Sequence, residues 1–152
     1  MLSTLKIDNK QSDKSKIRAI ICGNIFQIIA TASSHQHLGT AYLTDVVLPA
    51  IAHRNVKVYF NDMGVPVGYV IWAYLSDDVE KKFKEENNYK MHISEWNEGK
   101  SLWIIDLLAP FGHFKNICRD IKKNVFRESK EINFFAAAPG RNTLRKYFRR
   151  SI

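Results

Sequence analysis

The chain has 152 residues, of which 45% are hydrophobic and 25% are charged, and its formal net charge at pH 7 is +8. This composition excludes a disordered or fibrous protein and fits one globular domain that is large enough to bury a core. The charge is uneven, because residues 113–152 hold 11 of the 23 Lys and Arg residues but only three of the 15 Asp and Glu residues. Such a basic block indicates either an acidic partner or a solvated basic face.

Residues 1–16 are polar and lack the apolar segment of a secretory signal, so we predict a loose leader followed by one domain over residues 17–152. The apolar runs fall far short of the roughly 20 residues that span a bilayer. We therefore expect a cytoplasmic protein that does not associate with membranes. Cys22 and Cys118 lie in apolar patterns without metal-ligand spacing. This favours buried free thiols, with a structural disulfide as the alternative.

Two helices are predicted in the first third of the chain, because apolar residues recur there at spacings of three and four. The first helix starts at Ile17, and its buried face consists of Ile17, Ile20, Ile21, Ile25, Ile28 and Ile29. The second covers residues 41–51, with a stripe made of Leu43, Val46, Val47 and Ala50. Pro49 should end or bend this second helix.

The hydrophobic period then changes to that of strands. Residues 56–62 and 63–75 read as a hairpin around a Gly-Val-Pro turn. Residues 77–84 are predicted as a charged helix, and residues 91–100 as a polar excursion. Residues 102–108 are apolar on both faces, which is typical of a central strand.

An amphipathic helix is predicted after Gly112. Its inward side chains are Phe114, Ile117, Cys118, Ile121, Val125 and Phe126, and its outward ones are Lys115, Arg119, Lys122, Lys123 and Arg127. Residues 132–138 are predicted as a fourth strand and residues 142–150 as a short basic helix or tail. The order of helices, hairpin, strand, helix and strand predicts an α+β domain with a mixed sheet.

The chain lacks the common chemical motifs. Its five histidines show no zinc-ligand spacing, and there is no G-x-S-x-G, Walker A or G-x-G-x-x-G sequence. We predict neither a metal site nor a bound cofactor. What remains is His35 or His37 after the first helix and Asp106 in the central strand. A lone carboxylate in a core needs a partner, so the pattern leaves open either a catalytic His-Asp pair or a surface histidine and a structurally satisfied carboxylate.

Residues 23–138 resemble the RTX toxin-activating lysine acyltransferases. The resemblance rests on the stretch from Gly23 through ATASSHQHLGTAYLTDVVLPAI, on GVPVGYVIWAYLS and above all on EWNEGKSLWIIDLLAPFG. The residues of the last stretch that keep the family spacing are Trp96, Gly99, Trp103, Ile105, Asp106, Ala109, Pro110, Phe111 and Gly112. The resemblance implies a GNAT-like fold with a central, mixed, mostly antiparallel sheet flanked by helices. It also implies fatty acyl transfer from acyl carrier protein to internal lysines of an RTX pro-toxin.

The family's catalytic aspartate falls on Asp106. An alignment without gaps puts the catalytic histidine on His35, with Ala32 where the family has serine. Either Ser33 or Ser34 then supplies the hydroxyl, or that function is absent. If the family's serine is instead aligned with Ser33 or Ser34, the catalytic histidine falls on His37. This alignment needs a two-residue deletion in the next helix, which would turn the apolar face of that helix by about 200°. We choose His35.

The resemblance assigns roles to these residues. His35 takes the proton of the acceptor amine as a base, or attacks the thioester as a nucleophile, and Asp106 orients its imidazole. Independently of the resemblance, we expect Trp72, Ala109, Phe111 and Gly112 to contact the acyl donor, with a role as core aromatics equally open for Trp72 and Phe111. The residues expected to contact the acidic acyl carrier protein are Arg119, Lys122 and Lys123. A homodimer is also suggested, and nucleic acid is not expected as a partner.

Two other functions are alternatives to this reading of the sequence. A GNAT acetyltransferase that uses acetyl-CoA should carry a loop that binds pyrophosphate at a helix N-terminus, and APFGHFKN does not supply one. A basic module that binds nucleic acid or membrane would use Arg141–Arg150, which shows no recognised reader motif.

Overall fold

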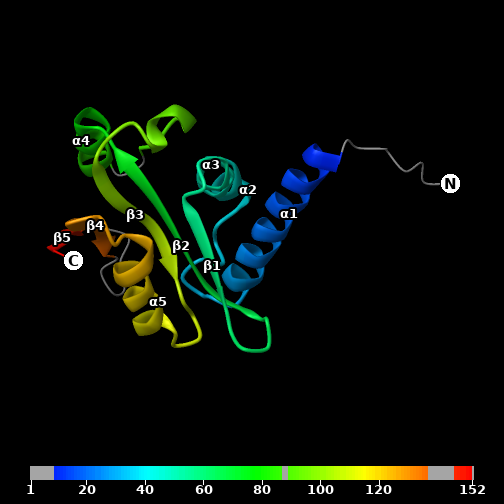
Figure 1. Ribbon diagram of the computed structural model, residues 1–152. Helices are drawn as coiled ribbons and strands as arrows, with labels where there is room; N and C mark the ends of the chain where they lie inside the picture. Colours follow the sequence, from blue (N-terminus) through cyan, green and yellow to red (C-terminus); the bar gives the residue numbers. More distant parts are fainter. Residues whose placement is uncertain (1–8, 87–88, 137–145, 152) are drawn as a thin grey trace.

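The computed structural model describes residues 9–86, 89–136 and 146–151, which form a five-stranded sheet with helices on both faces (Figure 1). The strands are β1 (Val56–Phe60), β2 (Pro66–Leu75), β3 (Ser101–Leu108), β4 (Glu131–Ala136) and β5 (Lys146–Ser151), and they follow one another in sequence order across the sheet. Neighbours are antiparallel except β3 and β4, which are parallel. The predicted α+β fold with a mostly antiparallel sheet is confirmed.

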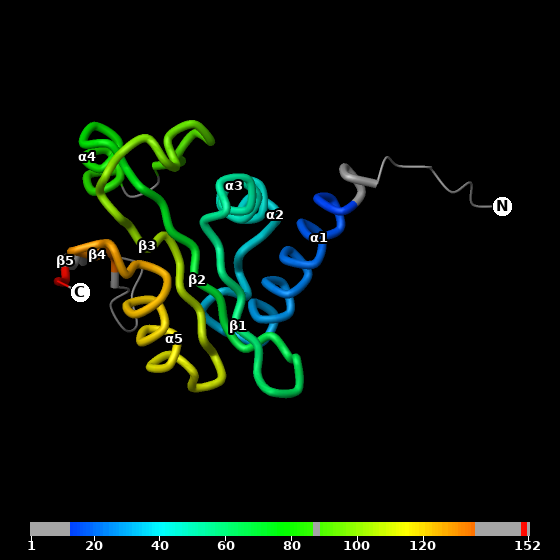
Figure 2. The backbone as a smooth tube through the Cα atoms, in the orientation of Figure 1, coloured from blue at the N-terminus to red at the C-terminus, as the bar shows by residue number. Residues whose placement is uncertain are grey.

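Each face of the sheet buries its own apolar cluster. On the α1 side, Ile25 and Ile28 pack with Ile71 and Trp103. On the α5 side, Ile117, Ile121 and Phe126 pack with Val70 and Leu102. Residues 69–75 therefore alternate between the two clusters, as expected for a strand covered on both faces. Figure 2 shows the first and last elements, α1 and β5, on opposite sides of the molecule.

The first helix, α1 (Asn9–Ala30), starts eight residues before its predicted start at Ile17, so the second half of the predicted leader is helical. Residues 1–8 lie outside the described ranges. Residues 9–16 are rich in lysine and other polar residues that extend an already formed helix at little cost.

The predicted core face of α1 is only partly right. Ile25, Ile28 and Ile29 are buried, but Ile17 is 56% exposed and Ile20 is 62% exposed. Only the C-terminal half of the helix packs on the sheet, because the N-terminal half extends past it (Figure 1).

The second predicted helix is present and continues through Pro49. It consists of α2 (Thr40–Tyr42), a wider π-helical segment η1 (Leu43–Val47) and α3 (Leu48–Ala52). The N–H of Leu48 donates to the carbonyl of Leu43, five residues back. Since Pro49 has no N–H to donate, the change of hydrogen-bond pattern just before it lets the helix continue.

The middle of the chain follows the predictions. β1 and β2 form the hairpin, and α4 (Asp77–Glu85) is the charged helix, with the Ser76 hydroxyl accepting from the N–H of Val79 at its start. A short 3₁₀ helix, η2 (Ile93–Trp96), buries Trp96 completely. β3 is the central strand of the five.

The predicted amphipathic helix is formed by α5 (Phe114–Asp120) and the π-helical η3 (Ile121–Val125). Ile117, Ile121 and Phe126 are buried as predicted, but Phe114 is 55% exposed. The reason is its position: it is the first residue of the helix, and a helical side chain leans toward the preceding turn, which is missing there.

The prediction of a basic helix or tail over residues 142–150 is wrong for the part that the structure describes. Residues 146–151 form β5, which pairs with β4 from Ala136↔Lys146 to Glu131↔Ser151. The free edge of β4 offers backbone hydrogen bonds, and these outweigh the charge pattern of the segment. Residues 137–145 lie outside the described ranges.

Gly99 allows the segment after η2 to lie against the end of β2. Its N–H donates to the carbonyl of Tyr74 at 3.0 Å. A Cβ atom at this position would lie 1.8 Å from the carbonyl oxygen of Leu75, which is far inside van der Waals contact. The glycine is therefore required by a close backbone approach.

We predict that Gly99→Ala lowers the free energy of unfolding by about 3 kcal/mol, because the backbone of one of the two segments must move. Urea denaturation followed by circular dichroism measures the change. Gly23→Ala in α1 is the control, since a Cβ there meets nothing within 4 Å. It should stabilise the helix by up to about 1 kcal/mol. A Gly99→Ala protein as stable as the parent would contradict the packing described here.

Candidate active site

Asp106 faces the α1 side of the sheet because β3 contains a bulge. Ile71 of β2 lies opposite Asp106, but the next residue, Trp72, lies opposite Ile104, so Ile105 is an extra residue in β3. Ile105 contacts the α1-side cluster, whereas Ile104 and Leu107 contact the α5-side cluster. The bulge thus puts two consecutive side chains, those of Ile105 and Asp106, on one face.

His35 meets this carboxylate from the turn that follows α1. Its N–H donates to the carbonyl of Ala32 at 2.9 Å, and its carbonyl accepts from the N–H of Leu38 at 2.9 Å, which fixes the turn. The imidazole Nε2 lies 3.1 Å from Oδ1 and 3.2 Å from Oδ2 of Asp106. Both side chains are mostly buried, with 18% and 17% of their surface exposed. The structure therefore brings the two predicted residues together across 71 positions of sequence.

Two tyrosines complete the cluster. Tyr69 of β2 donates its hydroxyl to Oδ2 of Asp106 at 2.9 Å, and Tyr42 of α2 donates to the same oxygen. The two hydroxyls lie 3.1 Å apart. Neither tyrosine was found from the sequence. The available signal was the position of Tyr69 on the inward face of β2, where a buried hydroxyl needs a polar partner.

Asp106 controls the electrostatics of the cluster. Its hydrogen bond raises the pKa of His35 above the ordinary value of 6.5, and its charge adds to this, although burial acts in the opposite direction. Burial, reinforced by the negative charge of Asp106, raises the pKa values of Tyr42 and Tyr69, so both hydroxyls remain protonated donors. Asp106 accordingly accepts hydrogen bonds from three donors, His35, Tyr42 and Tyr69.

This arrangement selects one tautomer of His35. Because Nε2 donates to Asp106, Nδ1 of the neutral ring carries the lone pair. The Ser34 hydroxyl lies 2.8 Å from Nδ1 and is exposed. The proton-accepting atom of the imidazole is thus on the side that faces solvent, while the opposite nitrogen is held in the protein. His37 is exposed and is not the histidine that meets Asp106.

β3 and β4 separate next to this cluster. Their pairing is limited to Trp103↔Asn133 and Ile104↔Phe134, although both strands continue beyond these pairs. Asp106 lies just past the point of separation. Over the described part of both strands, no β3–β4 pair therefore forms at Asp106.

The other predicted site residues lie apart from the pair. Trp72 packs edge-on against Phe126 on the α5 side, with ring centroids 5.2 Å apart. Ala109 contacts the same α5-side cluster, while Phe111 is 49% exposed. Gly112 has a φ of +82°, which favours glycine, in the turn that leads into α5. None of these four residues is among the hydrogen-bond partners of His35 or Asp106 in the described part of the chain.

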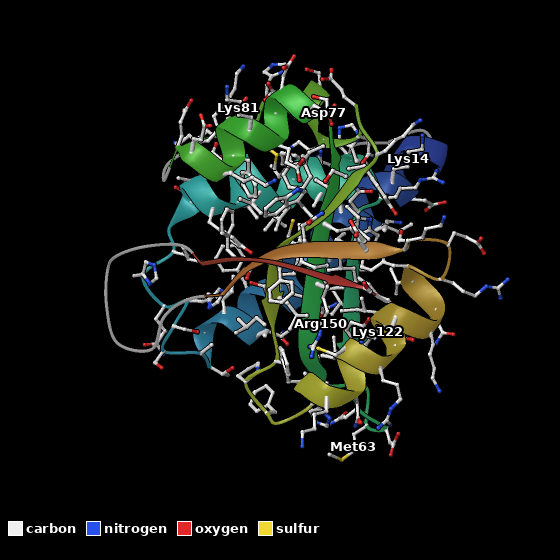
Figure 3. The ribbon with its side chains drawn as sticks, turned by 90° about the vertical axis from the view of Figure 1, so that its left-hand side faces the viewer. Lys14, Met63, Asp77, Lys81, Lys122 and Arg150 are labelled. Atoms are coloured by element: carbon white, nitrogen blue, oxygen red, sulfur yellow. The ribbon has the colours of Figure 1, made fainter. Side chains whose placement is uncertain are left out.

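The predicted basic surface is solvent-accessible. It consists of Arg119, Lys122 and Lys123, which are all exposed along α5 and η3. Lys122 of η3 and Arg150 of β5 lie on the same side of the molecule (Figure 3), and both lower the pKa of Cys118 electrostatically. The surface therefore combines positive charge from the helix and from the edge strand.

Cys22 and Cys118 are free and half-buried, and burial raises the pKa of each thiol, which makes both poor nucleophiles. Over residues 9–86, 89–136 and 146–151, no group of three or more His, Cys, Asp or Glu side chains is arranged to hold a metal ion. None of the helices in these ranges has the length and apolar character needed to cross a bilayer.

Comparison with known proteins gives a consistent result. The family model of the RTX toxin acyltransferases matches residues 14–146. The leukotoxin-activating lysine-acyltransferase of Mannheimia haemolytica serotype A1 is 32% identical over 111 residues, which cover 70% of this chain and 65% of the relative. The RTX-II toxin-activating lysine-acyltransferase of Actinobacillus pleuropneumoniae is 33% identical over 60% of this chain and 56% of its own length. An uncharacterised protein of Synechocystis is 29% identical over 70% of this chain and 72% of its own length.

We predict that Asp106→Asn lowers the pKa of His35 to below its ordinary value of 6.5, since the variant loses the hydrogen bond and charge that raise it and keeps the burial that lowers it. NMR titration of the imidazole measures this pKa. Asp120→Asn is a matched control, because Asp120 also accepts from a tyrosine, Tyr59, but belongs to a cluster with Lys57 and Asn124. An unchanged His35 titration in Asp106→Asn would show that Asp106 does not control the imidazole.

Proposed function

Because the chain belongs to the RTX toxin acyltransferase family, we propose that it transfers a fatty acyl group from acyl carrier protein to the ε-amine of an internal lysine of an RTX pro-toxin. The observation that carries this proposal is the contact between His35 and Asp106 beside the separation of β3 and β4. Two relatives named as toxin-activating lysine-acyltransferases support it. The acyl donor enters as a co-substrate, and no bound cofactor takes part.

The reaction needs a base because the acceptor is a protonated amine. A lysine with a pKa near 10.4 requires about 4 to 5 kcal/mol to lose its proton at pH 7. His35 accepts this proton at Nδ1, and Asp106 stabilises the resulting imidazolium through Nε2. The two tyrosine hydroxyls keep Asp106 in place during the charge change.

The bond changes are those of thioester aminolysis. The deprotonated lysine nitrogen attacks the thioester carbonyl carbon, a C–N bond forms, and the C–S bond breaks. His35 releases the first lysine proton to solvent, then accepts the second N–H proton, which the attacking nitrogen loses as it becomes an amide. It passes this second proton to the departing thiolate, which leaves as the thiol of the carrier's prosthetic arm. The Ser34 hydroxyl, in contact with Nδ1, either relays the proton or yields its place to the amine.

The basic surface fits the acidic carrier. Arg119, Lys122 and Lys123 follow the turn at Gly112, so a carrier docked there lies near the end of β3, the strand that holds Asp106, and its thioester-bearing arm extends from there to His35. Opposite charges at such a surface mainly raise the association rate and fix the orientation of the donor.

We predict that His35→Ala lowers the rate of lysine acylation about 10³-fold, because the base is lost. The measurement is mass spectrometry of acylated lysines, with acyl-acyl carrier protein as donor and the unacylated RTX pro-toxin of the same genome as acceptor. His37→Ala is the matched control and should retain the parent rate. Full activity of His35→Ala would remove His35 from the chemistry, and loss of activity in His37→Ala alone would transfer its role to His37.

We also predict that the triple variant Arg119→Glu, Lys122→Glu and Lys123→Glu raises the KM for acyl-acyl carrier protein at least about tenfold with little change in kcat. The effect should weaken at high salt. The control with the same change in net charge is Lys16→Glu, Lys81→Glu and Lys100→Glu, three exposed lysines on other parts of the chain. An equal rise in KM in both variants would contradict a specific docking surface. Equal turnover of acyl-CoA and acyl-acyl carrier protein would contradict the carrier as the donor.

A further inference from the structure

A groove of about 840 Å³ lies along the N-terminal half of α1, away from His35 at the other end of that helix. Its other walls are α3 and the start of β1. A volume of this size lies in the range of sites for small molecules, roughly 300 to 1,000 Å³.

The walls of the groove are aliphatic. They are formed by Ile17, Ile21, Leu48, Ile51 and Val56. Ile17 is 56% exposed although it continues the stripe of α1 that is buried further along at Ile25 and Ile28. The α1-side core thus extends beyond the sheet, and no other described residue covers it there, so this apolar surface lies in water, which is unfavourable.

The rim of the groove is cationic. Lys14, Arg18 and Arg54 line it, and no acidic residue does. Among the described residues, none of these three cations forms an ion pair with an aspartate or glutamate. Arg54 has a φ of +60°, a conformation that is unfavourable for a residue other than glycine. The groove therefore offers positive charge that the described part of the protein does not neutralise.

These features restrict the occupant. A second copy of the chain, packed symmetrically on this groove, would bring Lys14, Arg18 and Arg54 of both copies together, which like-charge repulsion disfavours. A suitable ligand carries an anionic group and a slender apolar part, because the walls hold aliphatic side chains and no aromatic ring.

We propose that this groove binds a long-chain fatty acid, with its alkyl chain against Ile17, Leu48 and Ile51 and its carboxylate at Arg18 and Arg54. The ligand class follows from the aliphatic walls and the unpaired cationic rim. The site is separate from the His35–Asp106 pair, so it does not depend on the function proposed above.

The test is calorimetric titration of the full chain with palmitate below its critical micelle concentration. We expect saturable binding of one palmitate per chain. Ile17→Ser and Arg18→Gln should each weaken binding about tenfold, because one removes apolar contact and the other removes a charge. The matched controls are Ile20→Ser and Lys16→Gln, exposed residues of the same helix that do not line the groove, and both should bind as the parent does.

Three outcomes would overturn the proposal. The first is an equal loss of palmitate affinity in the groove variants and in the control variants. Another is equal binding of dodecyltrimethylammonium, which has a long chain but the opposite charge. The third is binding to phosphatidylglycerol vesicles without binding of monomeric palmitate, which would assign the groove to a membrane surface. Butyrate, which has the same head group and a short chain, should bind far more weakly than palmitate.

Discussion

The carboxylate of Asp106 must be satisfied inside an apolar sheet, and this requirement ties the N-terminal helices to the centre of the fold. An unpaired carboxylate would be strongly destabilising there, whereas one that accepts several hydrogen bonds is tolerated. Its donors come from three elements: the turn after α1, the helix α2 and the strand β2. One charged side chain therefore fixes the position of the imidazole and of both tyrosines.

The position of Asp106 in the site depends on the bulge at Ile105 in β3. A strand that alternated strictly from Trp103 would turn Asp106 toward α5, away from His35. The extra residue at Ile105 prevents this and keeps Leu107 and Leu108 in their separate clusters. β-bulges often re-aim side chains at functional sites in this way. The bulge cannot be read from the sequence, because it is defined by the register with β2.

Local patterns were enough to predict much of the fold. The hairpin, α4 and the central strand follow from hydrophobic period and turn residues that act within a few positions. The errors concern tertiary contacts. The segment at residues 146–151 becomes a strand because β4 offers a free edge, and Ile17 stays exposed because the sheet ends before α1 does. For the site, the residue pattern alone identified Asp106, His35 and His37 as candidates, and the family resemblance selected His35 over His37. Tyr42 and Tyr69 could not be identified from the sequence, because their hydroxyls meet Asp106 only through the packing of α2 and β2 around it.

The two halves of α1 have different surroundings, and this links the catalytic proposal with the groove. Its C-terminal half is packed on the sheet and delivers His35, while its N-terminal half carries an apolar stripe with cations beside it. The basic surface of α5 and η3 lies on the other face of the sheet. Donor docking, proton transfer and fatty-acid binding are thereby assigned to three separate sets of residues in one small domain. A substitution in one set therefore does not change a residue of the other two.

The central claim is that Asp106 makes His35 the base of acyl transfer. The most direct measurement is the pH dependence of single-turnover acyl transfer in the parent and in Asp106→Asn. A base must be neutral to accept a proton, so the rate of the parent should fall as the pH drops through the raised pKa of His35, with a midpoint above 6.5. In Asp106→Asn the midpoint should move to lower pH. The same midpoint in both proteins would contradict the claim.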